Sequence, residues 1–378
     1  MSDQIIATIE THFGNIEDPR RTYLNDHPLI NIITIALCAV IAGAESWNDM
    51  ANFGQQKTDW LSKFLDLKNG IPSHDTFARV FARLDPEQFR QGFLSWVQAV
   101  FEITNGQVIA IDGKQLRRSH DKSSKKKAIH MVSAWATANH LVLGQVKVEG
   151  KSNEITAIPA LLSLLDLTDC IVTIDAIGTQ TEIAQQIIDQ GGDYLLPVKK
   201  NQKQLYEDIE LFFKLAQENE FAKVTHTHHR TVNGGHGRIE VRQCWAISGA
   251  ESLDFLRGED NWPKLKTMVM MQFERHIKRK VTRQTHYFIT SAANDAQAIL
   301  AAKRTHWGIE NELHWVLDVA FREDDCRVRL GNAPQNLAIL RHMVLNLLKQ
   351  EKTAKGGIKA KRLQAAWNND YLGKVLSG

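Results

Sequence analysis

Two short apolar runs that each end in an aspartate place the strongest constraint on what this chain can fold into. The first run is Val108–Asp112 and the second is Ile171–Asp175. Unbroken apolar runs of this length are typical of strands that are covered on both faces of a sheet. We therefore expect both runs to lie inside one sheet, with Asp112 and Asp175 at its carboxyl edge.

The segments around these runs predict a mixed α/β sheet. Strands are expected at His130–Thr137 and Leu141–Val148 after the first run, and at Tyr194–Val198 after the second. Helices are expected at Ile155–Leu165 and Thr179–Gln190. The resulting order is three strands, helix, strand, helix, strand. This is the ribonuclease-H-like order, in which an antiparallel trio is joined by parallel crossovers.

The rest of the chain divides around this core. The N-terminal part is expected to be all-helical, and Ser73 behind Pro72 is a favourable residue to begin one of its helices. A polar, strand-rich stretch follows the third parallel strand. The predicted organisation is a helical domain at 1–104, the first part of the core at 105–220, a β-rich insertion at 221–291, core helices at 292–350 and a basic C-terminal tail at 351–378.

The composition allows nucleic-acid binding without requiring it. Lys and Arg total 46 against 43 acidic residues, so the net charge is only +3 and any DNA-binding surface must come from local clusters. The apolar stretch Leu29–Ala44 is short for the roughly 20 residues of a membrane span, and we expect a buried helix there. The four cysteines form no C-x-x-C pair and the N-terminus lacks a secretory pattern, so a reducing cytoplasm is the expected location.

Carboxylates at the ends of buried strands indicate a cation site. An ionised carboxylate is costly to bury without a partner, and two of them in one sheet suggest a shared divalent ion. Either aspartate could instead simply cap the turn that follows it. A third carboxylate is expected from the helical segment 303–312, which offers Glu310 and Glu312. These two lie about 200° apart around a helix, so only one can face the site, and spacing alone does not choose between them.

Basic residues near the predicted carboxyl edge are candidate DNA contacts. The segment 113–130, directly after Asp112, is rich in Lys and Arg and could neutralise phosphates, although a solvated hairpin tip would look the same. Trp307 and Trp315 are expected in the core, and the histidines near 226–236 are expected on an ordinary polar strand. The expected DNA contacts are Lys114, Arg117, Arg118, Lys199, Asn201, Arg238 and His306.

A series of sequence pieces, in order along the chain, resembles the DDE transposases of bacterial insertion sequences, specifically the subgroup of H-repeat-associated proteins. The resemblance covers essentially the whole chain. The pieces are DPRR at 18–21, HPL at 27–29, GIPSHDTFARVF at 70–81, AIDGK at 110–114, KSNEITAIPALL at 151–162, TIDAIGTQ at 173–180, GGDYLLPVKKNQ at 191–202, HGRIEVR at 236–242 and HWGIENELHWVLDVAFREDDCRVRLGNA at 306–333.

The resemblance implies a ribonuclease-H-like catalytic domain that cuts and rejoins DNA at insertion-sequence ends, using two Mg²⁺ or Mn²⁺ ions. Asp112 and Asp175 match the first two catalytic aspartates of the family. The W-x-I-E segment of related transposases matches residues 307–310 and so selects Glu310 as the third, with Asp318, Glu323 and Asp324 as acidic alternatives. The implied partner is double-stranded DNA bound by a homodimer in the bacterial nucleoid, with neither a membrane nor a small-molecule substrate.

The sequence also departs from the wider family. Lys303, His306 and Leu317 stand where many relatives have Tyr, Arg and Lys around the catalytic glutamate. The departure leaves open how DNA phosphates are held and whether a hairpin intermediate forms. Two alternatives therefore stay in view: a DNA-binding remnant that has lost its chemistry, and a nuclease that cuts DNA without joining it.

Overall fold

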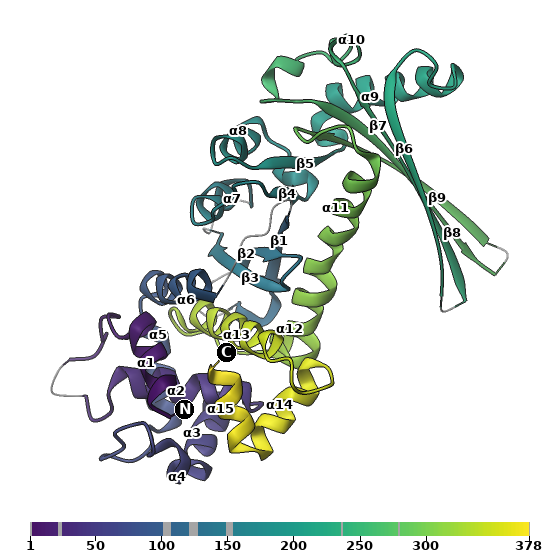
Figure 1. Ribbon diagram of the computed structural model, residues 1–378. Helices are drawn as coiled ribbons and strands as arrows, with labels where there is room; N and C mark the ends of the chain where they lie inside the picture. The colour runs from purple at the N-terminus through teal and green to yellow at the C-terminus, as the bar shows by residue number, and fades with distance from the viewer. Residues whose placement is uncertain are drawn as a thin grey trace.

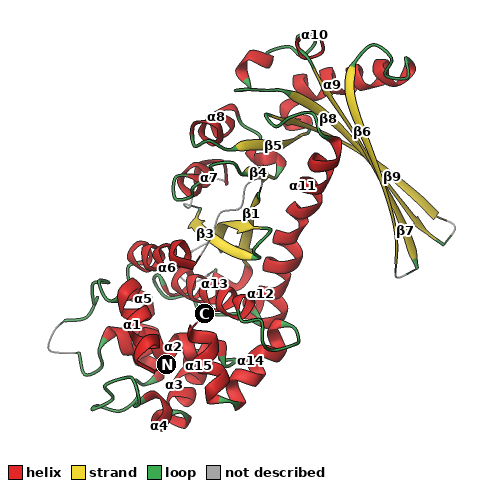
Figure 2. Ribbon diagram, in the orientation of Figure 1, coloured by secondary structure: helices red, strands yellow, loops and turns green. Residues whose placement is uncertain are grey.

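The computed structural model describes residues 2–21, 25–100, 107–120, 128–148, 154–235, 237–278 and 280–377. Its strands form one mixed nine-stranded sheet in the order β3-β2-β1-β4-β5-β9-β8-β7-β6. Figure 1 shows helices from both ends of the chain gathered at one end of the molecule, the first strands in the middle and the long strands β6 to β9 at the other end. Figure 2 shows the same division by secondary structure, with helices at one end and extended strands at the other.

The middle of the molecule is the predicted sheet. β1 pairs antiparallel with β2, and β2 with β3, while β1, β4 and β5 run parallel. The strand order expected from the sequence is therefore confirmed for this part of the chain. The strands are β1 (Val108–Leu116), β2 (Ile129–Ala136), β3 (Leu141–Lys147), β4 (Ile171–Ile174) and β5 (Asp193–Val198).

The register of β1 and β4 brings the two predicted aspartates to the same level. Ile111 pairs with Ile174 in the parallel ladder, so Asp112 and Asp175 each follow one residue later. The first four residues of β1 are buried, as are the last three of β4. The apolar runs are thus interior strands. Asp175 lies at the carboxyl end of β4 as expected, whereas β1 continues past Asp112 to Leu116 in its pairing with β2.

The insertion extends the same sheet instead of forming a separate one. β9 pairs antiparallel with β5 and with β8, β8 pairs with β7, and β7 pairs with the edge strand β6. The polar strand expected around the histidines near 226–236 is present as the edge strand β6, whose sequence is largely exposed and carries no apolar alternation. The strands are β6 (Thr225–Gly235), β7 (Arg238–Ser248), β8 (Thr267–Ile277) and β9 (Lys280–Thr290), with the short helix α10 (Ala250–Leu253) after β7.

Helices cover the sheet on both faces. α7 (Glu154–Leu162) and α8 (Thr181–Asp189) lie on one side, and α11 (Ala296–Gly308) runs along the other (Figure 1). α9 (Lys203–Glu218) follows β5 and packs against β9. The face covered by α11 is the one that matters for the site, because this helix leads directly into the segment that carries Glu310.

The N-terminal part is helical, as predicted. Ser73 accepts a hydrogen bond from the Thr76 amide at the start of α5, in the expected capping position. Asn31–Ile41 of α2 is buried, and within the described part of the chain no helix has both the length and the apolar character to cross a membrane. The helices are α1 (Ser2–Phe13), α2 (Leu29–Ile41), α3 (Trp47–Gln56), α4 (Thr58–Leu61), α5 (His74–Arg83) and α6 (Pro86–Val100).

The C-terminal segment, expected as a basic tail, instead forms two packed helices, α14 (Ile358–Trp367) and α15 (Asn369–Ser377). Both contact α2. Arg362 is 4 % exposed and donates to the Val40 carbonyl, and Lys361 is 7 % exposed and donates to the Leu348 carbonyl. Part of the basic charge therefore serves internal contacts, which explains why charge alone misidentified this segment.

The helix α13 (Ala333–Gln350) joins the helical region to the sheet. It contacts α2, α5 and α6 as well as the edge strand β3. The side chain of Asn346 both accepts from the Val142 amide and donates to the Val142 carbonyl, at 2.9 Å each. Pairing by Asn346 satisfies backbone groups of a sheet edge that would otherwise need another partner.

Candidate active site

One helical stretch carries the third carboxylate. α11 begins at its N-cap Asp295, whose side chain accepts from the Gln297 and Ala298 amides. It leads into a π-helical turn at Ile309–His314 and then into α12 (Trp315–Ala320). Such turns are rare, contain more residues per turn than an α-helix, and often occur at functional sites.

The π-turn keeps four polar side chains on the face toward the sheet. His306 contacts Thr173, Glu310 and His314 face Asp112, and Asp318 pairs with Lys114. These helix positions are spaced by four residues, which would drift by about 40° per step on an α-helix. The wider turn reduces that drift, so that all four reach the carboxyl half of the sheet.

Asp112, Glu310 and His314 form a compact cluster. One potential ligand atom from each lies within 4.8 Å of the others. The His314 Nδ1 atom is 3.4 Å from Asp112 Oδ2 and 3.8 Å from Glu310 Oε2. The side chains of Asp112 and His314 are 13 % and 8 % exposed, whereas that of Glu310 is 51 % exposed. The cluster is thus enclosed on the strand side and open on the helix side.

The two carboxyl groups influence each other strongly. Burial, together with the neighbouring Glu310, raises the pKa of Asp112 to about 8. The nearby His314 and the hydrogen bond with Asp112 lower the pKa of Glu310 to about 2. Two carboxylates at this separation favour a shared proton or a cation between them. The donor set therefore fits a divalent metal ion.

Asp175 lies beside this cluster but not within it. It follows β4 directly, is exposed, and its charge contributes to the raised pKa of Asp112. It also acts electrostatically on Lys303 and His306. Asp175 is therefore close enough to share an ion environment with Asp112, on the side of the site that is open to solvent.

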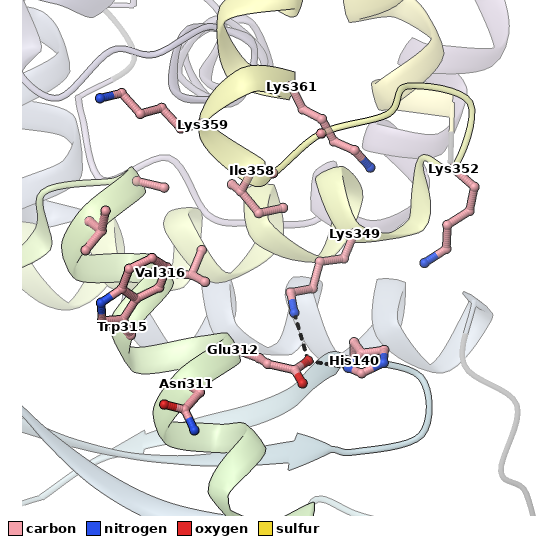
Figure 3. A pocket seen from close by; sticks show the side chains of 14 residues that line it. His140, Asn311, Glu312, Trp315, Val316, Lys349, Lys352, Ile358, Lys359 and Lys361 are labelled. Atoms are coloured by element: carbon pink, nitrogen blue, oxygen red, sulfur yellow. Dashed lines mark hydrogen bonds and ion pairs between the residues drawn. The ribbon is translucent and has the colours of Figure 1, made fainter. Parts of the chain in front are cut away.

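The other acids considered for the third position are engaged elsewhere. Glu312 pairs with Lys349 at 3.5 Å and with His140, as Figure 3 shows. Asp318 and Glu323 both pair with Lys114, and Asp324 pairs with Arg117. Of these candidates, Glu310 alone belongs to the cluster with Asp112.

Two residues expected to bind DNA are internal. Lys114 is 12 % exposed at its side chain and donates to the His314 carbonyl at 3.3 Å, besides its ion pairs with Asp318 and Glu323. His306 is 7 % exposed, its Nδ1 atom lies 2.8 Å from the Thr173 hydroxyl, and burial lowers its pKa to about 4. We therefore withdraw both as DNA contacts and assign them to holding the helix against the sheet.

The remaining predicted contacts lie on the surface. Arg117 and Arg118 are exposed and pair loosely with Asp324 and Asp325. Lys199 is exposed after β5, and exposed Asn201 donates to the Ala176 carbonyl at 2.8 Å. Arg238 is exposed on β7 and pairs with Glu240 at 3.2 Å. The lysine-rich part of the segment after Asp112, residues 121–127, lies outside the described residues.

A basic groove follows the outer side of the Glu310 helix. Three adjoining hollows, of about 490, 400 and 540 Å³, share Asn311, and Figure 3 shows the first. Trp307 and Trp315 line the groove and are 58 % and 60 % exposed, so the expectation that they are core residues was wrong. We call this surface the outer groove; its charged lining residues are Arg238, Arg242, Arg275, Lys303, Arg304, Lys349, Lys352, Lys359, Lys361, Glu240, Glu274 and Glu312.

Comparison with known protein families accounts for this arrangement. Residues 104–347 match the family model described as the transposase DDE domain, and residues 10–97 match the model described as DDE_Tnp_1-associated. The chain belongs to the DDE transposase family. The matched domain contains all three acids of the proposed triad and the β-strand insertion.

The similarity to related proteins extends over nearly the whole length of this DDE transposase family member. The H repeat-associated putative transposase YhhI of Escherichia coli (strain K12) is 40% identical over 97% of each chain. The putative transposase YncI of Escherichia coli O157:H7 is 43% identical over 98% of this chain and 95% of its own. A shorter relative, the inactive transposase YbfQ of Escherichia coli (strain K12), is 42% identical over 72 residues, which are 19% of this chain and 86% of its own.

His314 was not among the residues expected at the site. Its spacing of four residues after Glu310 was a usable signal, because such neighbours share a helix face. No comparable sequence pattern indicates that Trp307 and Trp315 point outward, since tryptophan on a helix is usually expected to be largely buried.

Proposed function

We propose that the chain is a DNA transposase that cleaves DNA at the ends of its element and transfers the resulting 3′-hydroxyl ends to a target. The observation that carries this proposal is the convergence of Asp112 and Glu310, with Asp175 at the same level on the neighbouring strand. The strand order β3-β2-β1-β4-β5 supports a ribonuclease-H-like core. Membership of the DDE transposase family supports the same reaction class.

In this proposal the three acids form a site for two divalent ions, Mg²⁺ or Mn²⁺. Asp112, Glu310 and Asp175 would hold these ions, with Asp112 between the other two acids. When bound, the ions activate the attacking oxygen and stabilise the departing one at a phosphodiester. The enclosed position of Asp112 fixes its carboxylate, and the exposed positions of Glu310 and Asp175 leave the site open to a DNA strand.

Double-stranded DNA is the proposed substrate and partner. The outer groove offers exposed lysines such as Lys352 and Lys359, and Arg304 extends this charge toward the insertion. Contacts of this kind position a phosphate backbone without reading its sequence. Exposed indole rings such as Trp315 could stack on unpaired bases. We further propose that a homodimer forms on paired ends.

Cleavage of a supercoiled plasmid tests the proposal. The plasmid carries the DNA that flanks the gene on both sides, and reactions contain Mg²⁺, Mn²⁺ or EDTA. Asp112→Asn, Asp175→Asn and Glu310→Gln are compared with the wild type. We expect metal-dependent cuts at the element ends that all three variants lose. Joining of pre-cut 3′-hydroxyl ends to a second plasmid then separates a transposase from a nuclease.

Two outcomes would replace the proposal. If the wild type cuts but never joins the pre-cut ends, the chain is a nuclease. If it binds the ends and never cuts with either metal, it is a DNA-binding remnant, an outcome with a parallel in the relative named inactive. Analytical ultracentrifugation of the chain with and without end DNA tests the homodimer.

A further inference from the structure

We infer that His314 is a direct ligand of the ion held by Asp112 and Glu310, so that this centre has one nitrogen and two carboxylate ligands. The inference rests on the proposed function, because it concerns the same metal site. It goes beyond the three acids expected of the family, none of which supplies a nitrogen donor.

The position of the imidazole supports a ligand. His314 is 6 % exposed, and its Nδ1 atom faces the Asp112 and Glu310 carboxylates at 3.4 and 3.8 Å. Charge-assisted hydrogen bonds are shorter, roughly 2.7–2.9 Å. Atoms that each bind one ion at about 2.1 Å lie roughly 3 to 4 Å apart, depending on the angle between them. The observed separations fall in that range.

Few other groups around His314 interact with its imidazole ring. Its Nε2 atom has no hydrogen-bond partner among the residues that the structure describes. Lys114 donates to the backbone carbonyl of His314 and not to its ring. The main chain is thereby held while the ring faces the two acids.

The π-turn explains how three donors meet. His314 ends the turn that begins next to Glu310, so both side chains come from one rigid helical segment. Asp112 comes from the interior strand β1, and Lys114 on the same strand clamps the helix at His314 and Asp318. Ligands on rigid elements hold a defined geometry better than ligands on loops.

A nitrogen ligand changes which ions are favoured. Mg²⁺ prefers an all-oxygen environment, whereas imidazole suits the transition metals. The wild-type site should therefore bind Mn²⁺ more tightly than Mg²⁺. The simplest rival is a protonated His314 that neutralises the two acids in the absence of metal. Such a cation would compete with the ion, and its removal would strengthen metal binding.

The test measures Mn²⁺ bound to the full chain. Electron paramagnetic resonance of free Mn²⁺ gives the affinity, and pulsed measurements detect coupling of bound Mn²⁺ to a directly coordinated ¹⁴N nucleus. We expect this coupling in the wild type and its loss in His314→Gln, with Mn²⁺ affinity falling at least about tenfold and Mg²⁺ affinity falling less. In His314→Asp, an oxygen ligand should retain ion binding without the ¹⁴N coupling.

His306→Gln is the matched control, because His306 is a buried histidine on the same helix that contacts Thr173 instead of the acids. It should keep the ¹⁴N coupling. Persistent coupling in His314→Gln, or unchanged or tighter Mn²⁺ binding, would overturn the assignment. Loss of Mn²⁺ binding in Asp112→Asn would then show that the metal site of the acids itself stands. If the wild type bound no Mn²⁺ at all, both this inference and the proposed metal-dependent function would fail. Circular dichroism confirms that each variant is folded.

Discussion

Lys114 Nζ lies 3.1 Å from the Glu323 carboxylate, and both side chains are enclosed, being 12 % and 2 % exposed. Arg341 approaches the other oxygen of Glu323 at 3.6 Å, and Lys114 also pairs with Asp318. Because Lys114 follows Asp112 by two residues on β1, it shares a face of the strand with that acid. The ion-pair network thus holds the strand of the first aspartate against the helix of Glu310.

Replacing Lys114 by Met should destabilise the fold. The change leaves Asp318 and enclosed Glu323 without their lysine, and breaking a buried ion pair on one side costs about 3–5 kcal/mol. Urea unfolding measures the loss of unfolding free energy. Arg117→Ala is the control, because that arginine is 75 % exposed and its pair with Asp324 should contribute less than about 1 kcal/mol. Equal losses in the two variants would show that the network is not structural.

Replacing each glutamate of the π-turn separately should distinguish an effect on DNA cleavage from an effect on folding stability. Glu310→Gln should reduce plasmid cleavage at least about 100-fold, the scale of losing one positioned catalytic group. Glu312→Gln should leave cleavage near the wild-type level, because Glu312 faces Lys349 and His140. Its cost should instead appear as about 1 kcal/mol of unfolding free energy. Loss of cleavage in Glu312→Gln alone would transfer the third catalytic position to Glu312.

Glu351 should make stability depend on pH. Burial alone would raise the pKa of Glu351, but hydrogen bonds from Thr353, Tyr371 and the Ala354 amide lower it to about 2. The stabilisation is then fully present above the ordinary pKa of 4.5 and is lost as the pH falls toward 2. At pH 7, Glu351→Gln should be about 2 kcal/mol less stable than the wild type in urea unfolding.

The difference in unfolding free energy between the wild type and Glu351→Gln should decrease steadily when urea unfolding is repeated at pH 5, 4 and 3.5. A gap that stays constant over this range would mean that the glutamate acts through packing and not through its charge. Glu259→Gln, in the short helical turn Glu259–Asn261, provides a control for general acid effects.

The outer groove should contribute to DNA binding in a salt-dependent way. Lys352→Ala combined with Lys359→Ala removes two exposed charges beside Trp315. If both contact phosphates, the slope of log affinity against log salt should fall by about 1.8. Fluorescence anisotropy with a flanking-DNA duplex, repeated at several salt concentrations, measures this slope. The matched control combines Lys214→Ala and Lys223→Ala, exposed lysines that do not line the groove. Equal slopes for both pairs would exclude the groove as a DNA surface.

The interior strands and the common level of their two acids follow from the sequence alone. Apolar runs without alternation can only be covered on both faces, and parallel strands of similar length end at one edge, so Asp112 and Asp175 were expected together. The choice of Glu310 over Glu312 needed the family resemblance, because helical periodicity leaves the direction of the face open. The edge strand β6 was expected only as a polar strand around its histidines and without bounds, because a solvated strand has no hydrophobic period.

Which charges are free depends on tertiary packing. Lys114, Lys361 and Arg362 look like surface cations in the sequence, yet each is buried against internal partners, and those of Lys114 and Arg362 are distant along the chain. The π-turn is equally invisible beforehand, because it depends on packing along the whole helix. That turn brings His314 to the acids and leaves Trp315 in solvent, which is why residue type alone could not identify either role.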